Sequence, residues 1–277
     1  MKQRGKQKVI LYGNCHMECI RLYLLSSCQF SEKYEIVDLP PIFRLNQENI
    51  NFDIFHECAV FIYQEVSDQT YKALGTKNII ARLPADCIKI CITKSYFTGY
   101  HPQYCYNTDC KSEPGYEFGR FPYGDSNILS MHGTKSKDEI LKILSDEDFY
   151  SKEYVRANVE NTLQELRRRE QDVDIKIADY IEENFQKKMI FHTVDHPNYE
   201  IIHYISSEIL ERLNLDSNEI RHIIIEGLKR VVIPIYPSVI KALELKFVSA
   251  DTRYSYFYHE ITFSEYIKLY MESCYGM

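Results

Sequence analysis

The sequence contains no tryptophan, no long uninterrupted apolar segment and no excess of basic residues. A membrane-spanning helix needs roughly 18 to 20 successive apolar residues, and charged residues interrupt every apolar run here before that length. We therefore expect no integral membrane segment. Lys and Arg number 33 against 40 Asp and Glu, which gives a net charge of −7. This balance argues against a protein that coats a nucleic-acid backbone, so no nucleic-acid partner is expected.

Cysteine pairs and metal-ligand spacings are also missing. The nine cysteines are odd in number and none forms a CxxC pair. Cys105 and Cys110 lie near His101, but their spacing is not that of a zinc site, so no metal is expected. The basic N-terminus precedes an apolar run, Val9 to Tyr12, that is too short for a signal peptide. We expect a cytoplasmic protein with reduced thiols.

Short apolar runs alternate with helical patterns in the first part of the chain. We predict strands at residues 8–12, 34–39, 59–64 and 88–93, and a last strand at 188–194, with helices near 16–25 and 68–74. Apolar strands separated by helices are typical of a parallel sheet that is covered on both faces. The predicted fold class is therefore α/β: one domain over residues 1–277 with an open, mainly parallel sheet flanked by helices.

Residues 96–124 form a long segment without periodicity that is rich in Tyr, Gly and Pro. Aromatic residues are scarce in disordered segments, so we expect an ordered, pocket-forming aromatic loop. Additional helices are predicted after it, at residues 125–131, 135–144, 152–169, 175–185 and 199–213. Residues 216–277 are expected to form a helical extension packed on the core.

The sharpest local feature is the sequence Gly13-Asn14-Cys15-His16 between the first strand and the first helix. Ligands of open α/β sheets bind beyond the carboxyl ends of the strands, and backbone amides at a helix N-terminus favour an anion. Such a position lowers the pKa of a thiol, so Cys15 is a candidate nucleophile and the amides a candidate oxyanion hole or phosphate cradle. A small buried cysteine that fills the turn remains the alternative.

Two His-Pro pairs and one arginine are further candidates. His101 lies in the aromatic loop, and His196 follows the predicted last strand, where a histidine could reach a nucleophile on the first turn. Each of them could equally be a structural hydrogen-bonding residue. Arg82 lies near a predicted sheet end and is a candidate to bind a phosphate.

The ordered set of motifs resembles a known family. The strand and helix around GNC, the loop FTGYHPQ, a long helix ending in RRRE, the segment DVDIKIADYIEENF and the segment IFHTVDHPN occur in this order within residues 8–215. This order is similar to that of the WcbI-like family of bacterial polysaccharide-biosynthesis acetyltransferases. The resemblance implies an α/β core with the layout of SGNH hydrolases, additional helices, binding of coenzyme A or acetyl-CoA, and modification of a capsule or surface sugar.

The resemblance also implies roles for residues, position by position. The GNC turn is matched, but His16 stands where the family commonly has Gln. The tyrosine and histidine of the loop motif, the Arg-Glu pair at the end of the long helix and the late His-Pro are matched as well, and the Arg-Glu pair is expected to face the site. The catalytic candidates are Cys15, His196 and His101. The cofactor-binding candidates are Gly13, Asn14, His16, Arg82, Tyr100 and Arg169.

Three functions remain open. The first is an acyltransferase that moves acetyl from acetyl-CoA to a carbohydrate hydroxyl, either through an acyl group on Cys15 or through direct attack assisted by His196 or His101 as general base. The second is an SGNH-like cysteine esterase or thioesterase, with water as the acceptor. The third is a non-catalytic CoA-binding protein of an envelope-assembly system, and association with other polysaccharide-biosynthesis proteins is compatible with all three.

Overall fold

The computed structural model describes residues 5–48, 50–107, 112, 114–249 and 251–277. The chain divides into two compact units. Unit 1 consists of Met1–Ser95, Arg167–Ile181 and Pro197–Leu228, and unit 2 of Tyr96–Leu166, Glu182–His196 and Lys229–Met277. The sequence predicts a single domain over residues 1–277, whereas the structure has two units, each with its own core. Helices α7 (Lys152–Arg169) and α8 (Ala178–Asn184) contribute residues to both units.

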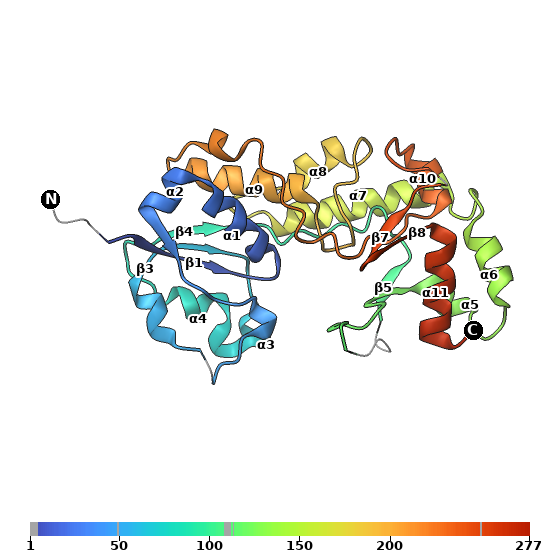
Figure 1. Cartoon of the computed structure of the whole chain (residues 1–277), viewed down its shortest axis with the longest axis horizontal. Coiled ribbons are helices and arrows are strands. Elements are labelled where there is room, and N and C mark those ends of the chain that lie inside the picture. Colours follow the sequence, from blue (N-terminus) through green and yellow to red (C-terminus); the bar gives the residue numbers. More distant parts are fainter. Residues whose placement is uncertain (1–4, 49, 108–111, 113, 250) are drawn as a thin grey trace. The chain divides into compact units, whose positions relative to one another are not determined.

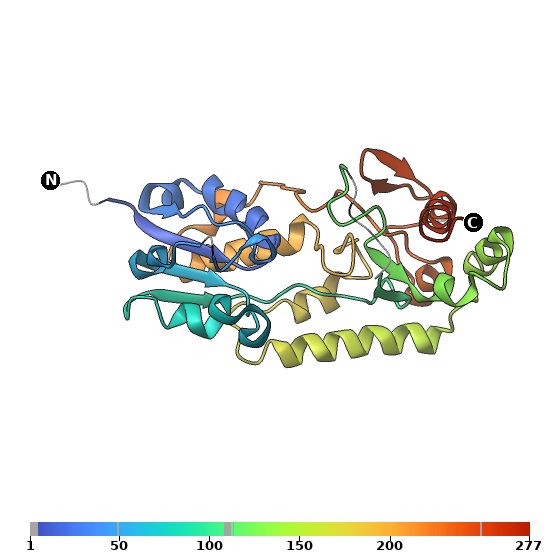
Figure 2. The ribbon, with the colours of Figure 1, turned by 90° about the horizontal axis from the view of Figure 1, so that it is seen from below.

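Unit 1 contains a parallel sheet in the strand order β2-β1-β3-β4 (Figures 1 and 2). The strands are β1 (Gln7–Tyr12), β2 (Tyr34–Ile36), β3 (Cys58–Tyr63) and β4 (Ile88–Cys91). Tyr12 pairs with Tyr63, and Tyr63 with Cys91, so these three strands end in one row. The residues that follow each strand therefore meet at the carboxyl edge of the sheet. This confirms the predicted α/β class with a parallel sheet flanked by helices.

Helices cover both faces of this sheet (Figure 1). The helices of unit 1 are α1 (His16–Ser26), α2 (Cys28–Lys33), α3 (Asp68–Tyr71), α4 (Thr76–Ile80) and α9 (Tyr199–Arg212). Side chains alternate along a strand, so Ile10 and Tyr12 point into an apolar cluster with Phe55, Phe61 and Ile79. The other face is covered by α1 and α9, which pack against each other.

Unit 2 is built from small elements around an aromatic core. They are β5 (Tyr104–Tyr106), β6 (Tyr123–Asp125), α5 (Ser126–Met131), α6 (Lys137–Leu144), α10 (Pro237–Leu243), β7 (Tyr254–Tyr256), β8 (His259–Ile261) and α11 (Phe263–Tyr275). Fully buried rings of Phe97, Tyr100, Phe121, Tyr236 and Tyr270 fill its interior. Several of the abundant tyrosines of the sequence therefore contribute to this core. The predicted aromatic loop contains the β5–β6 hairpin, although residues 108–111 and 113 lie outside the described residues.

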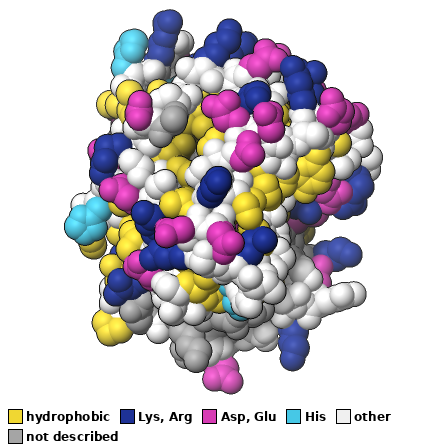
Figure 3. Space-filling model, turned by 90° about the vertical axis from the view of Figure 1, so that its right-hand side faces the viewer, with side chains coloured by type: hydrophobic (Ala, Val, Ile, Leu, Met, Phe, Trp, Pro, Cys, Tyr) yellow, Lys and Arg dark blue, Asp and Glu magenta, His cyan; other side chains and the backbone are white. Residues whose placement is uncertain are grey.

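Residues 216–277, which the sequence predicts to form a helical extension, fall into two parts. Its first part belongs to unit 1, and the rest contributes α10, the β7–β8 hairpin and α11 to unit 2. On the face that Figure 3 shows, acidic and basic side chains alternate with hydrophobic ones, and no broad basic field appears. In the described part of the chain, no helix is long and apolar enough to cross a membrane.

The predicted last strand at residues 188–194 is wrong. Ile190, Phe191 and Val194 are buried, but they pack in unit 2 and join no sheet strand. The chain turns back on itself instead, because the His192 amide donates to the carbonyl of His196 over 2.8 Å. The apolar run at these residues reflects burial in unit 2, and it has the same pattern as a buried strand. The predicted strand at 34–39 is also shorter than expected, and ends at Ile36.

Candidate active site

The turn between β1 and α1 leaves little space beside its first residue, Gly13. A Cβ atom on Gly13 would lie 2.6 Å from Oε1 of Gln64 and 2.8 Å from Cε of Met17. The carbonyl of Gly13 accepts a hydrogen bond from the Ile42 amide over 2.8 Å. Gly13 therefore acts through close packing of the backbone, and its role is to let the turn approach Gln64.

Gln64 directly follows β3 and holds this turn in place. Its side chain is 2% exposed. Oε1 accepts a hydrogen bond from the Asn14 amide over 3.0 Å, and Nε2 lies 3.1 Å from Nδ1 of His16. Nε2 is also 3.5 Å from the carbonyl oxygen of Thr93, which follows β4. One amide side chain thus connects the carboxyl ends of β1, β3 and β4.

These contacts define the tautomer of His16, which is fully buried at the start of α1. Because Oε1 of Gln64 accepts from the Asn14 amide, the other end of the side-chain amide is the donor. Nδ1 of His16 must then accept from it, and the ring proton of the neutral imidazole is on Nε2. The first-turn histidine therefore has a structural partner on Nδ1.

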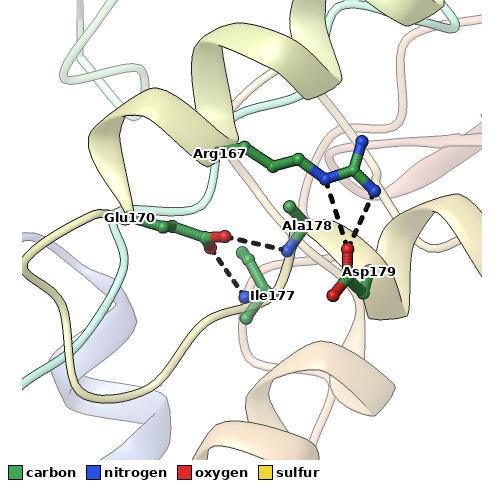
Figure 4. Close-up of polar contacts among 5 residues, drawn as sticks. All are labelled: Arg167, Glu170, Ile177, Ala178 and Asp179. Atoms are coloured by element: carbon green, nitrogen blue, oxygen red, sulfur yellow. Dashed lines mark hydrogen bonds and ion pairs between the residues drawn. The ribbon is translucent and has the colours of Figure 1, made fainter.

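The polar network continues from Thr93 to the start of α8. The hydroxyl of Thr93 donates to Oε1 of Glu170 over 2.8 Å. Glu170, which is 2% exposed, also accepts from the amides of Ile177 and Ala178 over 2.7 and 3.3 Å (Figure 4). Its carboxylate caps the helix that follows. Glu170 was expected to face the site, but its oxygens are occupied by these three donors.

Three backbone amides of the first turn already have hydrogen-bond acceptors. Asn14 Oδ1 accepts from the His16 amide over 3.0 Å, and the Asn14 carbonyl accepts from the Met17 amide over 3.1 Å. The Glu18 amide donates to the carbonyl of Cys15 over 3.2 Å. The expected use of these amides as a phosphate cradle or oxyanion hole would require them to give up these partners.

Cys15 is the N-cap residue of α1 and is partly exposed. Its backbone is already helical, with φ −59° and ψ −18°, and its side chain makes no capping hydrogen bond. Helix α1 has 11 residues, so its macrodipole places partial positive charge next to the thiol. A thiol in such a position is more acidic and more reactive than a buried one. Partial exposure argues against the alternative in which Cys15 only fills the turn.

Tyr100 and His101 belong to unit 2 and are buried there. The Tyr100 hydroxyl donates to the backbone carbonyls of Phe185 and Lys188 over 2.5 and 3.0 Å, and burial raises its pKa. Burial also lowers the pKa of His101 to about 3. An imidazole with so low a pKa is a weak base at neutral pH. Both side chains therefore have the properties of structural residues.

His196 lies in the turn of residues 192–196 rather than at the end of a sheet strand. Its amide donates to the Thr193 hydroxyl over 3.1 Å, and its ring lies edge-on to Tyr123 at 6.2 Å between centroids. The Tyr123 hydroxyl donates to Asp195 over 2.7 Å. Burial lowers the pKa of His196, and the nearby Asp195 opposes this shift. The imidazole is therefore neutral at physiological pH and able to accept a proton.

Of the two predicted arginines, one lies away from the GNC turn and the other is exposed. Arg82 lies between α4 and β4, and its guanidinium is 4.4 Å from the centroid of the Phe52 ring. This is the amino-terminal edge of the parallel sheet, opposite to the GNC turn. Arg169 is exposed at the end of α7. Among the described residues, no group of three or more His, Cys, Asp or Glu side chains could hold a metal ion; Cys110 lies outside the described residues.

Gln64 and Thr93 are site residues that we did not predict from the sequence. Each is a polar residue just after an apolar strand, and each is buried at the carboxyl edge of the sheet. The rule that sites form at this edge could have selected both. The site predicted from the sequence uses only the first strand and the predicted last strand.

Comparisons with known proteins identify a family for this chain and a solved structure with a similar fold. A family model for the polysaccharide biosynthesis enzyme WcbI matches residues 8–218. No curated protein matches the sequence. A solved structure of WcbI, a novel polysaccharide biosynthesis enzyme, is similar with a TM-score of 0.82 and 18% identity, over 99% of this chain and 91% of that chain. It is described as the native protein without a disulfide bond between CoA and one of its cysteines.

Proposed function

The chain belongs to the WcbI family of polysaccharide biosynthesis enzymes, and we propose that it transfers an acyl group from a CoA thioester to a hydroxyl of a polysaccharide precursor. Acetyl-CoA is the simplest such donor. The observation that carries the proposal is the partly exposed Cys15 at the N-terminus of α1, at the carboxyl edge of the sheet. Further support comes from the similar WcbI structure, whose description names CoA together with a cysteine.

The reaction has two balanced steps. In the first, the Cys15 sulfur attacks the thioester carbonyl, the carbon–sulfur bond to CoA breaks, and CoA leaves as the thiol with the proton of Cys15. In the second, the sugar hydroxyl attacks the acyl group on Cys15, and its proton returns to the sulfur as the ester leaves. Both steps pass through a tetrahedral oxyanion, which needs a hydrogen-bond donor close to Cys15.

We assign that donor to the side chain of Asn14. Its Oδ1 atom accepts from the His16 amide, which fixes the side chain and orients the Nδ2 group. The fixed NH₂ group carries two donor hydrogens. Because the first-turn amides of His16, Met17 and Glu18 are occupied, Asn14 supplies the preorganised donor next to the thiol.

The general base remains a prediction. His101 is a poor choice because burial lowers its pKa to about 3. His196 keeps a neutral imidazole at physiological pH and stays our candidate for accepting the proton of the sugar hydroxyl. A His196→Ala variant should form acyl-Cys15 at the wild-type rate but transfer the acyl group to sugar more slowly.

Thermal-shift measurements with CoA, acetyl-CoA, nucleotide sugars and simple esters test the binding part of the proposal. A ligand that binds only the folded protein raises its apparent stability, by about 2.7 kcal/mol at a concentration of 100 Kd. We expect CoA and acetyl-CoA to raise the melting temperature and simple esters to leave it unchanged. A response to esters without a response to CoA would instead favour the esterase. Release of CoA at a rate that no sugar increases would favour the thioesterase.

A further inference from the structure

A cavity of about 500 Å³ lies in unit 1 next to the GNC turn. Residues of α1 form one wall and the segment of residues 36–41 after β2 forms another. Its volume is within the usual range of small-molecule pockets, about 300–1,000 Å³. It is far larger than an acetyl group needs, since one water molecule occupies about 30 Å³ of liquid.

The walls of this cavity are mostly apolar. The hydrophobic lining side chains are Leu11, Met17, Leu22, Ile36, Val37 and Leu39. The charged lining residues Glu18, Arg21 and Asp38 are all exposed, so their charges meet solvent at the rim. A cavity in which apolar side chains outnumber three exposed charged ones fits a hydrocarbon chain.

Cys15 is close in the sequence to several residues that line this cavity. Gly13 and Glu18, on either side of Cys15 in the sequence, both line it. Cys15 already has helical φ and ψ angles, so residues three and seven positions later share its face. Those residues are Glu18 and Leu22, and both are lining residues. An acyl group on the Cys15 sulfur would therefore begin beside the cavity.

We propose that this cavity binds the acyl chain of the donor, and that the preferred donor carries a chain of about six to eight carbons rather than acetyl. The inference rests on the proposed function and names its acyl group. Each methylene that enters the cavity should raise kcat/KM about fourfold, because burying one CH₂ group raises the affinity by about that factor. Four buried methylenes would give a preference of roughly 250-fold over acetyl.

The test compares CoA release from acetyl-, butyryl-, hexanoyl- and octanoyl-CoA at concentrations below KM. We expect kcat/KM to rise about fourfold per methylene and then to level off where the cavity is filled. The matched variants are Leu22→Trp and Leu25→Trp. Both leucines are on α1 and are similarly exposed, 47% and 42%, but only Leu22 lines the cavity.

Leu22→Trp should reduce the octanoyl-to-acetyl ratio of kcat/KM at least tenfold, and Leu25→Trp should keep the wild-type ratio. Because the chain has no tryptophan, each variant also carries a single fluorescent reporter. Octanoyl-CoA should shift the emission at position 22 and leave that at position 25 unchanged.

A flat chain-length profile in the wild-type protein, or equal ratios in the two variants, would overturn the inference while leaving acyl transfer standing. If no thioester, acetyl-CoA included, released CoA or changed the melting temperature, the proposed function itself would fail.

Discussion

Replacing Gln64 with methionine should destabilise unit 1, because this side chain satisfies two polar groups of the GNC turn. Methionine has nearly the same length and volume, so packing is largely preserved. The change leaves Nδ1 of the buried His16 without its donor, which costs about 1–3 kcal/mol. It also removes the acceptor of the partly buried Asn14 amide, which costs about 0.5–1.5 kcal/mol.

The expected loss is therefore about 2–4 kcal/mol in the free energy of unfolding. For a chain of this size, the melting temperature should fall by roughly 4 to 16 °C. Thermal and urea unfolding followed by circular dichroism measure the loss, and hydrogen exchange of the Asn14 amide measures it locally. The matched control is Gln171→Met, at an exposed position of unit 1, where we expect a change within about 0.5 kcal/mol. Equal effects of the two substitutions would refute the role of Gln64.

Three further predictions concern single side chains. Glu170→Ala removes the acceptor of two buried backbone amides and should cost about 3 kcal/mol or more in urea unfolding, whereas Arg167→Ala breaks an exposed ion pair with Asp179 and should cost about 1 kcal/mol or less. Asn14→Asp keeps an oxygen for the His16 amide but removes the NH₂ donor, so acylation of the enzyme by acetyl-CoA should slow about 10²–10³-fold with little change in melting temperature; a normal rate would exclude Asn14 as the oxyanion donor. Burial raises the pKa of Asp125 to about 6 from 3.8, so the folded state gains stability from this group below pH 3.8 and loses it as pH rises through 6. The free energy of unfolding of Asp125→Asn relative to the wild type should therefore be more favourable at pH 7 than at pH 4. Parallel pH profiles of variant and wild type would contradict this assignment.

The strands of unit 1 could be predicted because their signals are local. β1, β3 and β4 are short apolar runs, and a parallel sheet buries both faces of each strand. The same signal failed at residues 188–194, because Phe191 and Val194 are equally apolar but are buried among the aromatic side chains of unit 2. A short apolar run indicates that its side chains are buried. It does not indicate whether they are buried in a strand or in a loop.

The candidate nucleophile could also be predicted, but the network that holds it could not. Cys15 is found from its position between a strand and a helix. Its support from Gln64 depends on the pairing of β1 with β3, which brings together residues that are 50 positions apart. The partners of the turn amides of His16, Met17 and Glu18 are likewise visible only in three dimensions.

Acylation of Cys15 is the central claim, and rapid mixing of the protein with labelled acetyl-CoA in the absence of any acceptor tests it most directly. Peptide mapping should find the label on Cys15 in a hydroxylamine-sensitive thioester, with release of an equal amount of CoA. The label should be absent from the Cys15→Ser variant and should leave the wild-type protein when an acceptor sugar is added. An unlabelled enzyme that still transfers the acyl group, or a Cys15→Ser variant with wild-type transfer, would contradict the account.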